Sequence, residues 1–354
     1  MKLCFLANAD SIHSYRWIKH FAEKGHVIEW ITLTPPNSSF AMDGIKLHLL
    51  KGHFLFNVNK IKKILKEIQP DILHSHYAGL YGLFGALCDF HPFVLTVWGS
   101  DVLLTIKSIV KKPLIIYSLK RADVITCDAV SMQKLLIKLN IEASKIKIIY
   151  FGVDTETSRR PLTNEPTSEG ADRTETPIVI SLRRLNPIYN VETLIRTIPF
   201  VLKAKPDITF IVAGNGTEEI RLKKMTELLG IPSNVQFIGW IDHKDIPRYL
   251  NKADIYVSTS LTDTTSVSLL EAMWSGAIPI ITDLIPNREL ITDGENGFIV
   301  PVKNPQVLAK KILFCLNNPK IIEQIRRANI KKIDESYNWQ KEMGKMETIY
   351  KQLL

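Results

Sequence analysis

The chain has 354 residues, of which 45% are hydrophobic and 23% charged, and its formal net charge is +9. This length predicts two globular domains, and four scattered cysteines without a CxxC pair argue against a disulfide framework or a zinc site. Because the sequence shows neither a signal peptide nor an apolar run of membrane-spanning length, we expect a cytoplasmic protein.

The positive charge is concentrated in the first half of the chain, where residues 1–150 contain 19 Lys/Arg against 11 Asp/Glu. Residues 103–121 mix Leu and Ile with five basic side chains and no acid. A helix of this kind suits the anionic headgroups at the inner face of a membrane, and a half-buried helix with solvated lysines fits equally well. No nucleic-acid-binding signature accompanies the charge, so we expect no nucleic acid partner.

Short apolar runs alternate with helical patterns along the chain. We predict strands over residues 2–8, 26–32, 70–77, 93–98, 122–128 and 145–152, separated by helices that include 14–25 and 58–68. A polar stretch rich in Thr, Glu and Pro follows at 155–177, which is typical of a linker. The alternation then restarts, with strands predicted over 178–184, 208–214, 235–240, 253–260 and 277–282.

This pattern predicts an α/β protein of two tandem, doubly wound, Rossmann-like domains. The predicted parts are an N-terminal acceptor-side domain (1–153), a linker (154–177), a C-terminal donor domain (178–335) and a C-terminal helix (336–354). One face of that helix is apolar, and we expect it to pack back on the N-terminal domain. Ligands of such sheets bind beyond the carboxyl ends of the strands, so the cleft between the domains is the expected site.

Several reaction classes lack their motifs in this sequence. It has no GxxxxGK[ST], HExxH or GxSxG pattern, which argues against P-loop, zincin and serine hydrolase chemistry. Gly214 and Gly216 form a bare GxG after a strand, and a tight turn explains this pattern better than a phosphate contact. His74 and His76 follow a strand without a third metal ligand, so a cleft-lining or core role is favoured over metal binding.

Two carboxylates, Asp263 and Glu271, flank a predicted helix start within residues 262–280. Ser266 is a suitable N-cap and Gly276 a suitable left-handed terminator. A helix N-terminus binds a diphosphate, and Glu271 would lie about 6 Å along the helix, near the ribose hydroxyls of a nucleotide. The spacing therefore suits a nucleotide-sugar. Taken alone, a turn and a solvated helix face explain the two acids equally well.

Longer segments resemble a known family. Asp263 and Glu271, the latter within LLEAMWSGAIPI, resemble the EX7E motif of retaining glycosyltransferases with the GT-B fold, of family four. Similar segments are YFGVDTE, SLRRLNPIYNVETLI and ELITDGENGFIV, so that the resemblance covers nearly the whole chain.

The resemblance implies a role for each matching residue. Glu271 would bind ribose, and Asp263 would bind hydroxyls of the donor sugar. Backbone N–H groups near Thr265, Ser266 and Val267, together with Gly214, would hold the sugar and diphosphate. Arg184 matches the arginine that pairs with the diphosphate, which a guanidinium grips in bidentate fashion.

The sequence departs from the family pattern at two positions, and both bear on the site. Tyr189 stands at the donor-side position where the family usually has Lys. Trp98 stands where many members have His, and with Asp10, His13 and His76 it completes the expected acceptor side.

We expect a retaining hexosyltransferase that moves sugar from a UDP- or GDP-sugar to a glycan or lipid-linked acceptor, as in polysaccharide or lipopolysaccharide biosynthesis. No cofactor or metal is expected, since no DxD dyad is present to hold Mg²⁺. Two alternatives remain open: a nucleotide-sugar epimerase or hydrolase of the same architecture, and a non-catalytic glycosyltransferase-like subunit.

Overall fold

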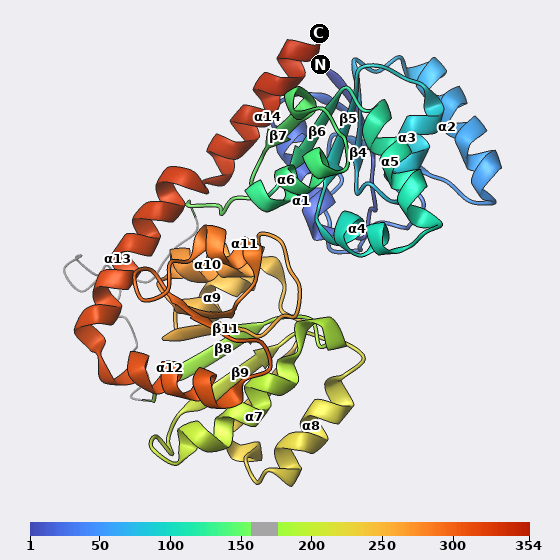
Figure 1. Ribbon diagram of the computed structural model, residues 1–354. Coiled ribbons are helices and arrows are strands. Elements are labelled where there is room, and N and C mark those ends of the chain that lie inside the picture. Colours follow the sequence, from blue (N-terminus) through green and yellow to red (C-terminus); the bar gives the residue numbers. More distant parts are fainter. Residues whose placement is uncertain (157–175) are drawn as a thin grey trace. The chain divides into compact units, whose positions relative to one another are not determined.

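The computed structural model describes residues 1–156 and 176–354, which form two compact units (Figure 1). Unit 1 comprises Met1–Tyr150 and Lys341–Leu354, and unit 2 comprises Phe151–Gln340. Each unit is built on one parallel sheet, which confirms the expected α/β class with two doubly wound domains. Most of the predicted linker, residues 157–175, lies outside the described residues.

The sheet of unit 1 has the strand order β3-β2-β1-β4-β5-β6-β7. Its strands are β1 (Lys2–Leu6), β2 (Val27–Thr32), β3 (Ile45–Leu49), β4 (Ile72–His76), β5 (Phe93–Val97), β6 (Val124–Cys127) and β7 (Ile146–Ile148). The α-helices are α1 (Ile12–Glu23), α2 (Phe54–Ile68), α3 (Leu80–Cys88), α4 (Ser100–Leu103), α5 (Lys111–Arg121), α6 (Val130–Lys138) and most of α14 (Trp339–Leu353).

The sheet of unit 2 has the order β10-β9-β8-β11-β12-β13. Its strands are β8 (Ile178–Leu182), β9 (Thr209–Ala213), β10 (Val235–Gly239), β11 (Ile255–Ser258), β12 (Ile278–Thr282) and β13 (Phe298–Val300). Its α-helices are α7 (Val191–Leu202), α8 (Glu219–Leu228), α9 (Ile246–Leu250), α10 (Val267–Ser275), α11 (Ile285–Leu290), α12 (Pro305–Asn317) and α13 (Pro319–Ser336). Helix α7 packs on α12, and α10 packs on α13 (Figure 1).

In both sheets the strand order reverses at an equivalent position, which marks the edge where a ligand is expected. Parallel strands that are covered on both faces have continuous apolar sequences. Accordingly, every residue of β5 and β12 is buried. The strand order reverses between β1 and β4 in unit 1 and between β8 and β11 in unit 2. Ligands of such sheets bind at the carboxyl ends of the strands beside the reversal, so these two edges are where a site is expected.

The prediction missed two strands, β3 and β13. Both lie at the edge of a sheet and pair with one neighbour, β2 and β12 respectively. Only Ile45 of the five residues of β3 is buried, and β13 is three residues long, so neither strand has a long apolar run that a sequence pattern can detect.

The expected helix over residues 103–121 is wrong as a single element. The segment divides into the end of α4, a 3₁₀ turn at Thr105–Lys107 and helix α5. Pro113 lies in the first turn of α5, where it is tolerated. Because its ring clashes with the carbonyl of the residue four positions earlier, an α-helix cannot continue through Ile109.

Helix α14 buries the apolar face that its spacing predicts. Trp339, Met343, Met346 and Tyr350 are all buried. The hydroxyl of Tyr350 lies 2.5 Å from Nδ1 of His74 on β4, and the Tyr350 ring also contacts that of Phe21 on α1. The C-terminal part of the helix is thus an integral part of the core of unit 1.

Candidate active site

Helix α10 begins and ends where the sequence predicts. Ser266 precedes it in an extended conformation, and Gly276 ends it in the left-handed region at φ 82°. A Cβ at Gly276 would also come within 3.0 Å of the Arg326 side chain. Thr265 and Ser266 are buried and Val267 is half-buried. The first turn of α10 therefore lies at the carboxyl edge of the unit 2 sheet, directly after β11.

Arg183 and Asp263 form an ion pair at this edge. Arg183 follows β8, and its Nη1 donates a hydrogen bond of 2.6 Å to Oγ of Ser266. The guanidinium lies over the ring of Tyr189, 4.6 Å from the ring centroid. Tyr189 belongs to a 3₁₀ turn, Pro187–Tyr189. Strands β8 and β11 are neighbours in the sheet, and this brings the residues that follow them together.

Burial and charge act in opposite directions on this pair. Burial raises the pKa of Asp263 above its ordinary value, and Arg183 limits that rise. Burial also opposes the charge on Arg183, but Asp263 and then Tyr256 and Tyr189 raise its pKa above the usual value. A buried guanidinium and carboxylate each need the other, since a single buried charge is costly.

Glu271 lies on α10 beside a residue that the sequence analysis did not select. Its Oε1 lies 2.9 Å from Nε2 of His243, and the Glu271 side chain is 12% exposed. His243 begins a short 3₁₀ turn, His243–Asp245, between β10 and α9. No spacing rule connects the two positions, so the contact is visible only in the fold.

The remaining donor-side predictions are placed differently. Arg184 is exposed, whereas its neighbour Arg183 reaches Asp263. The N–H of Gly214 donates to the carbonyl of Gly239 at 2.7 Å, and a Cβ at Gly214 would lie 2.3 Å from the carbonyl oxygen of Arg183. A tight backbone approach therefore accounts for this glycine, and its N–H is already used in the fold.

Three of the predicted acceptor-side residues form an aromatic cluster in unit 1. The rings of His13 and Trp98 lie 5.7 Å apart, and those of His76 and Trp98 lie 5.4 Å apart. His76 ends β4, and Trp98 directly follows β5. The fourth residue, Asp10, is exposed and accepts a hydrogen bond of 3.2 Å from Asn37.

The two histidines at the end of β4 have different surroundings. Nε2 of His74 lies 2.6 Å from Oγ1 of Thr96, which with the Tyr350 contact gives both ring nitrogens a partner. Neither ring nitrogen of His76 has a hydrogen-bond partner within residues 1–156 and 176–354. Burial lowers the pKa of His76 to about 3, so its ring is neutral at physiological pH.

Comparison with known proteins relates the chain to glycosyl transferases. Residues 165–332 match the family described as glycosyl transferases group 1, and residues 2–129 match the one described as glycosyl transferase 4-like. The two matched segments lie in the two halves of the chain, and both are described as glycosyl transferases. It is 26% identical over 307 residues to an uncharacterized glycosyltransferase of Methanocaldococcus jannaschii, covering 85% of this chain and 81% of that protein.

A second relative is named as part of an assembly. The chain is 23% identical to a phosphatidylinositol N-acetylglucosaminyltransferase subunit of Arabidopsis thaliana, and the match covers 83% of this chain and 64% of the relative. Among solved structures, HepE of Anabaena in complex with UDP-glucose superimposes with a TM-score of 0.84 at 18% identity, over the full length of both chains. This last likeness establishes the GT-B glycosyltransferase fold.

Asp101 is a buried carboxylate of unit 1 that the sequence analysis did not select. Its buried carboxylate accepts backbone hydrogen bonds from Ala78 at 2.7 Å, Trp98 at 3.2 Å and Val102 at 3.1 Å. It therefore ties the loop after β4 to the loop after β5. Burial raises its pKa to about 6, although the backbone hydrogen bonds oppose the rise.

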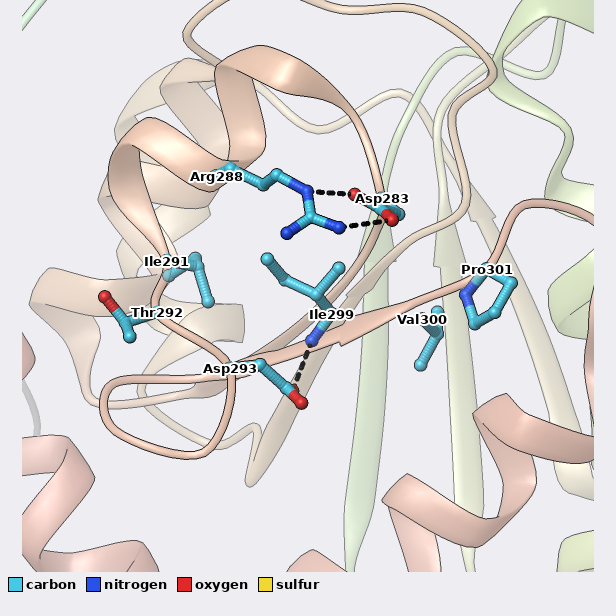
Figure 2. Close-up of a pocket in the computed structure, with 8 residues that line it drawn as sticks. All are labelled: Asp283, Arg288, Ile291, Thr292, Asp293, Ile299, Val300 and Pro301. Atoms are coloured by element: carbon cyan, nitrogen blue, oxygen red, sulfur yellow. Dashed lines mark hydrogen bonds and ion pairs between the residues drawn. The ribbon is translucent and has the colours of Figure 1, made fainter.

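A separate hollow of about 410 Å³ lies beside the ends of β12 and β13. Figure 2 shows Arg288 paired with Asp283 across its rim, at 2.5 and 2.7 Å, and Asp293 accepting from the N–H of Ile299. None of the predicted site residues lines it. Its one Arg is already neutralised by Asp283, so the hollow adds nothing to the donor-side cluster.

In residues 1–156 and 176–354, no three His, Cys, Asp or Glu side chains gather closely enough to hold a metal ion. Over the same ranges no helix has both the length and the apolar character needed to cross a membrane.

Proposed function

We propose that the chain is a retaining hexosyltransferase that moves a sugar from a nucleoside diphosphate sugar to a glycan or lipid-linked acceptor. The observation that carries this proposal is the N-terminus of α10, with Asp263 before it and Glu271 one turn inside it. A helix N-terminus attracts a diphosphate, and two carboxylates accept hydrogen bonds from sugar and ribose hydroxyls. The likeness to a fold solved with UDP-glucose supports a nucleotide-sugar donor.

The main chemical demand is the negative charge that builds on the departing diphosphate. Arg184, with the N–H groups of the first turn of α10, would neutralise this charge, and we propose that no metal ion is needed. Retention of configuration needs no carboxylate nucleophile if a phosphate oxygen of the leaving group takes the proton of the acceptor hydroxyl. The new glycosidic bond then forms on the face from which the diphosphate departs.

The acceptor side is proposed to involve the aromatic cluster of His13, His76 and Trp98. Aromatic rings present flat apolar faces and ring nitrogens that suit a sugar acceptor. A relative whose name describes sugar transfer to phosphatidylinositol supports a glycan or lipid-linked acceptor, in the manner of cell-surface polysaccharide or lipopolysaccharide biosynthesis.

The basic surface around α5 is proposed to meet the cytoplasmic face of an anionic membrane. Ile109 and Val110 are 92% and 77% exposed just before the helix. The helix itself presents Lys112, Tyr117 and Lys120 beside them, around a shallow apolar groove. Exposed apolar side chains with several lysines and no acid match the chemistry of a lipid headgroup layer.

The test is a calorimetric titration of UDP and of GDP into the protein with EDTA present, followed by turnover assays with the matching sugar donors. We expect one nucleotide to bind in the micromolar range without metal, and Asp263→Asn to impair transfer while sparing the free nucleotide. No binding of either nucleotide by a folded sample would overturn the proposal. Tight binding without turnover on any acceptor would favour a non-catalytic subunit, and release of free sugar would favour a hydrolase.

A further inference from the structure

Arg183 is a largely buried cation in a place where a cation is electrostatically disfavoured. Its side chain is 9% exposed, and its Nη1 bonds to Ser266, the residue at the N-cap position of α10. A helix N-terminus carries partial positive charge, so a buried guanidinium beside it needs an anion to remain favourable. Asp263 is the carboxylate that meets this need.

The contacts hold Asp263 from two sides. Nη2 of Arg183 pairs with Oδ2, and the N–H of Thr264 donates to Oδ1 at 3.1 Å. On the other side of the guanidinium, the ring of Tyr189 stacks at 4.6 Å. Arg183 is therefore fixed by Ser266 and Tyr189, and in turn fixes one oxygen of the carboxylate while the other keeps a single backbone partner.

We propose that Arg183 is a positioning residue that keeps Asp263 ionised and oriented toward the donor sugar. The orientation toward the sugar rests on the proposed function, whereas the control of ionisation rests on the geometry alone. A buried carboxyl group that loses its cation binds a proton more readily. A protonated Asp263 has weakened acceptor capacity for a sugar hydroxyl, so Arg183 sets the lowest pH at which the site works.

Neighbouring elements place polar groups around the Arg183–Asp263 pair. Tyr256 on β11 and Tyr189 on the 3₁₀ turn face Arg183, and Ser266 and Ser268 of α10 add neutral hydroxyls. Arg183 and Asp263 are the charged members of this cluster, and of the two the carboxyl group is the one expected to change charge in the acid range.

The first measurement follows the carboxyl carbon of Asp263 by ¹³C NMR as a function of pH, with the resonance identified by its loss in Asp263→Asn. In Arg183→Gln we expect the pKa of Asp263 to rise by at least about one unit. Arg183→Lys retains a positive charge and should keep most of the wild-type value. Arg196→Gln is the matched control, because it removes an exposed arginine from its pair with Glu192 in the same unit.

The second measurement is the pH profile of kcat/KM for sugar transfer. Its acid limb should move to higher pH in Arg183→Gln, and Arg183→Gln should add little to the defect of Asp263→Asn. A pKa of Asp263 that does not change in a folded Arg183→Gln would overturn the inference. A rise in that pKa in a protein that transfers no sugar would leave the inference on ionisation standing and remove the proposed function instead.

Discussion

The imidazole Nε2 of His243 lies 2.9 Å from Oε1 of Glu271 and joins the turn after β10 to helix α10. Glu271 therefore contacts a second element of the sheet edge, although Nε2 of His243 makes no aligned hydrogen bond within the described residues. If Glu271 binds ribose, its orientation depends on His243 as well as on its own helix.

Glu271→Ala should weaken binding of the free nucleotide by roughly 10- to 100-fold, because hydrogen bonds to a charged group contribute about 1.5–3 kcal/mol each. His243→Gln should weaken it by a few-fold, since the carboxylate remains. Calorimetric titration of the nucleotide gives both values, with the exposed Glu295→Ala as control. Unchanged affinity in Glu271→Ala would remove Glu271 from the ribose.

Arg184→Ala should reduce kcat far more than donor binding, by about 10²–10³-fold, because charge on the diphosphate grows as the glycosidic bond breaks. Steady-state kinetics with varied donor concentration separate the two effects. Equal losses in kcat and donor affinity would contradict this role. The exposed Arg196→Ala is the control for loss of an arginine from the same unit.

Asp101 should make the stability of unit 1 fall as pH rises. Its folded-state pKa of about 6 exceeds the ordinary 3.8, so the folded protein holds the proton more tightly than the unfolded chain between these values. As pH rises from 3.8 to about 6 the stability therefore falls by ~3 kcal/mol, and the loss is complete above that range. Urea unfolding at pH 4.5 and 7.5 measures this: the stability of Asp101→Asn relative to wild type should increase with pH. A constant difference between the two proteins would be the contrary result.

Tyr350→Phe should destabilise unit 1 by about 1–3 kcal/mol, because Nδ1 of the buried His74 would lose the partner that lies 2.5 Å away. Urea unfolding at neutral pH measures the change. Tyr117→Phe is a matched control, since Tyr117 is 42% exposed on α5 and its hydroxyl can meet water. A loss no larger than that of the control would mean that the buried contact contributes little.

Reversing two lysines of α5, in Lys111→Glu/Lys112→Glu, should reduce binding to vesicles that contain phosphatidylglycerol by about tenfold or more. Wild-type binding should also weaken as salt increases, and vesicles of phosphatidylcholine alone should bind poorly. Sedimentation with vesicles measures the bound fraction. Lys310→Glu/Lys320→Glu, at exposed positions of unit 2, is the control. Equal losses in both double variants would indicate a general charge effect.

Sequence patterns predicted those elements whose position depends on the conformation of single residues or on continuous burial of a strand. Ser266 and Gly276 bound α10 as expected because the extended N-cap and the left-handed terminator are properties of those residues in their immediate context. The buried strands were found because parallel strands covered on both faces become apolar runs. Strand β3 is mostly unburied and β13 has only three residues, and both were missed.

Sequence patterns did not predict which side chains contact one another. The sequence offers Arg183 and Arg184 as adjacent, equivalent cations, and only the twist of the chain after β8 buries the first and exposes the second. Asp101 binds the N–H of Ala78 on another loop, and His243 lies beside Glu271 on helix α10. Their positions carry no periodicity, so their contacts follow from the tertiary structure alone.

Helix α14 has a consequence for how the protein is made. A ribosome synthesises residues 1–150 before residues 151–340, yet the core of unit 1 includes Met343, Met346 and Tyr350, which are made after both stretches. Unit 2 can complete its sheet earlier, while the nascent unit 1 still exposes the apolar surface that α14 will cover. The first unit to begin folding is therefore the last to finish, and a chain interrupted before residue 341 releases it with that surface uncovered.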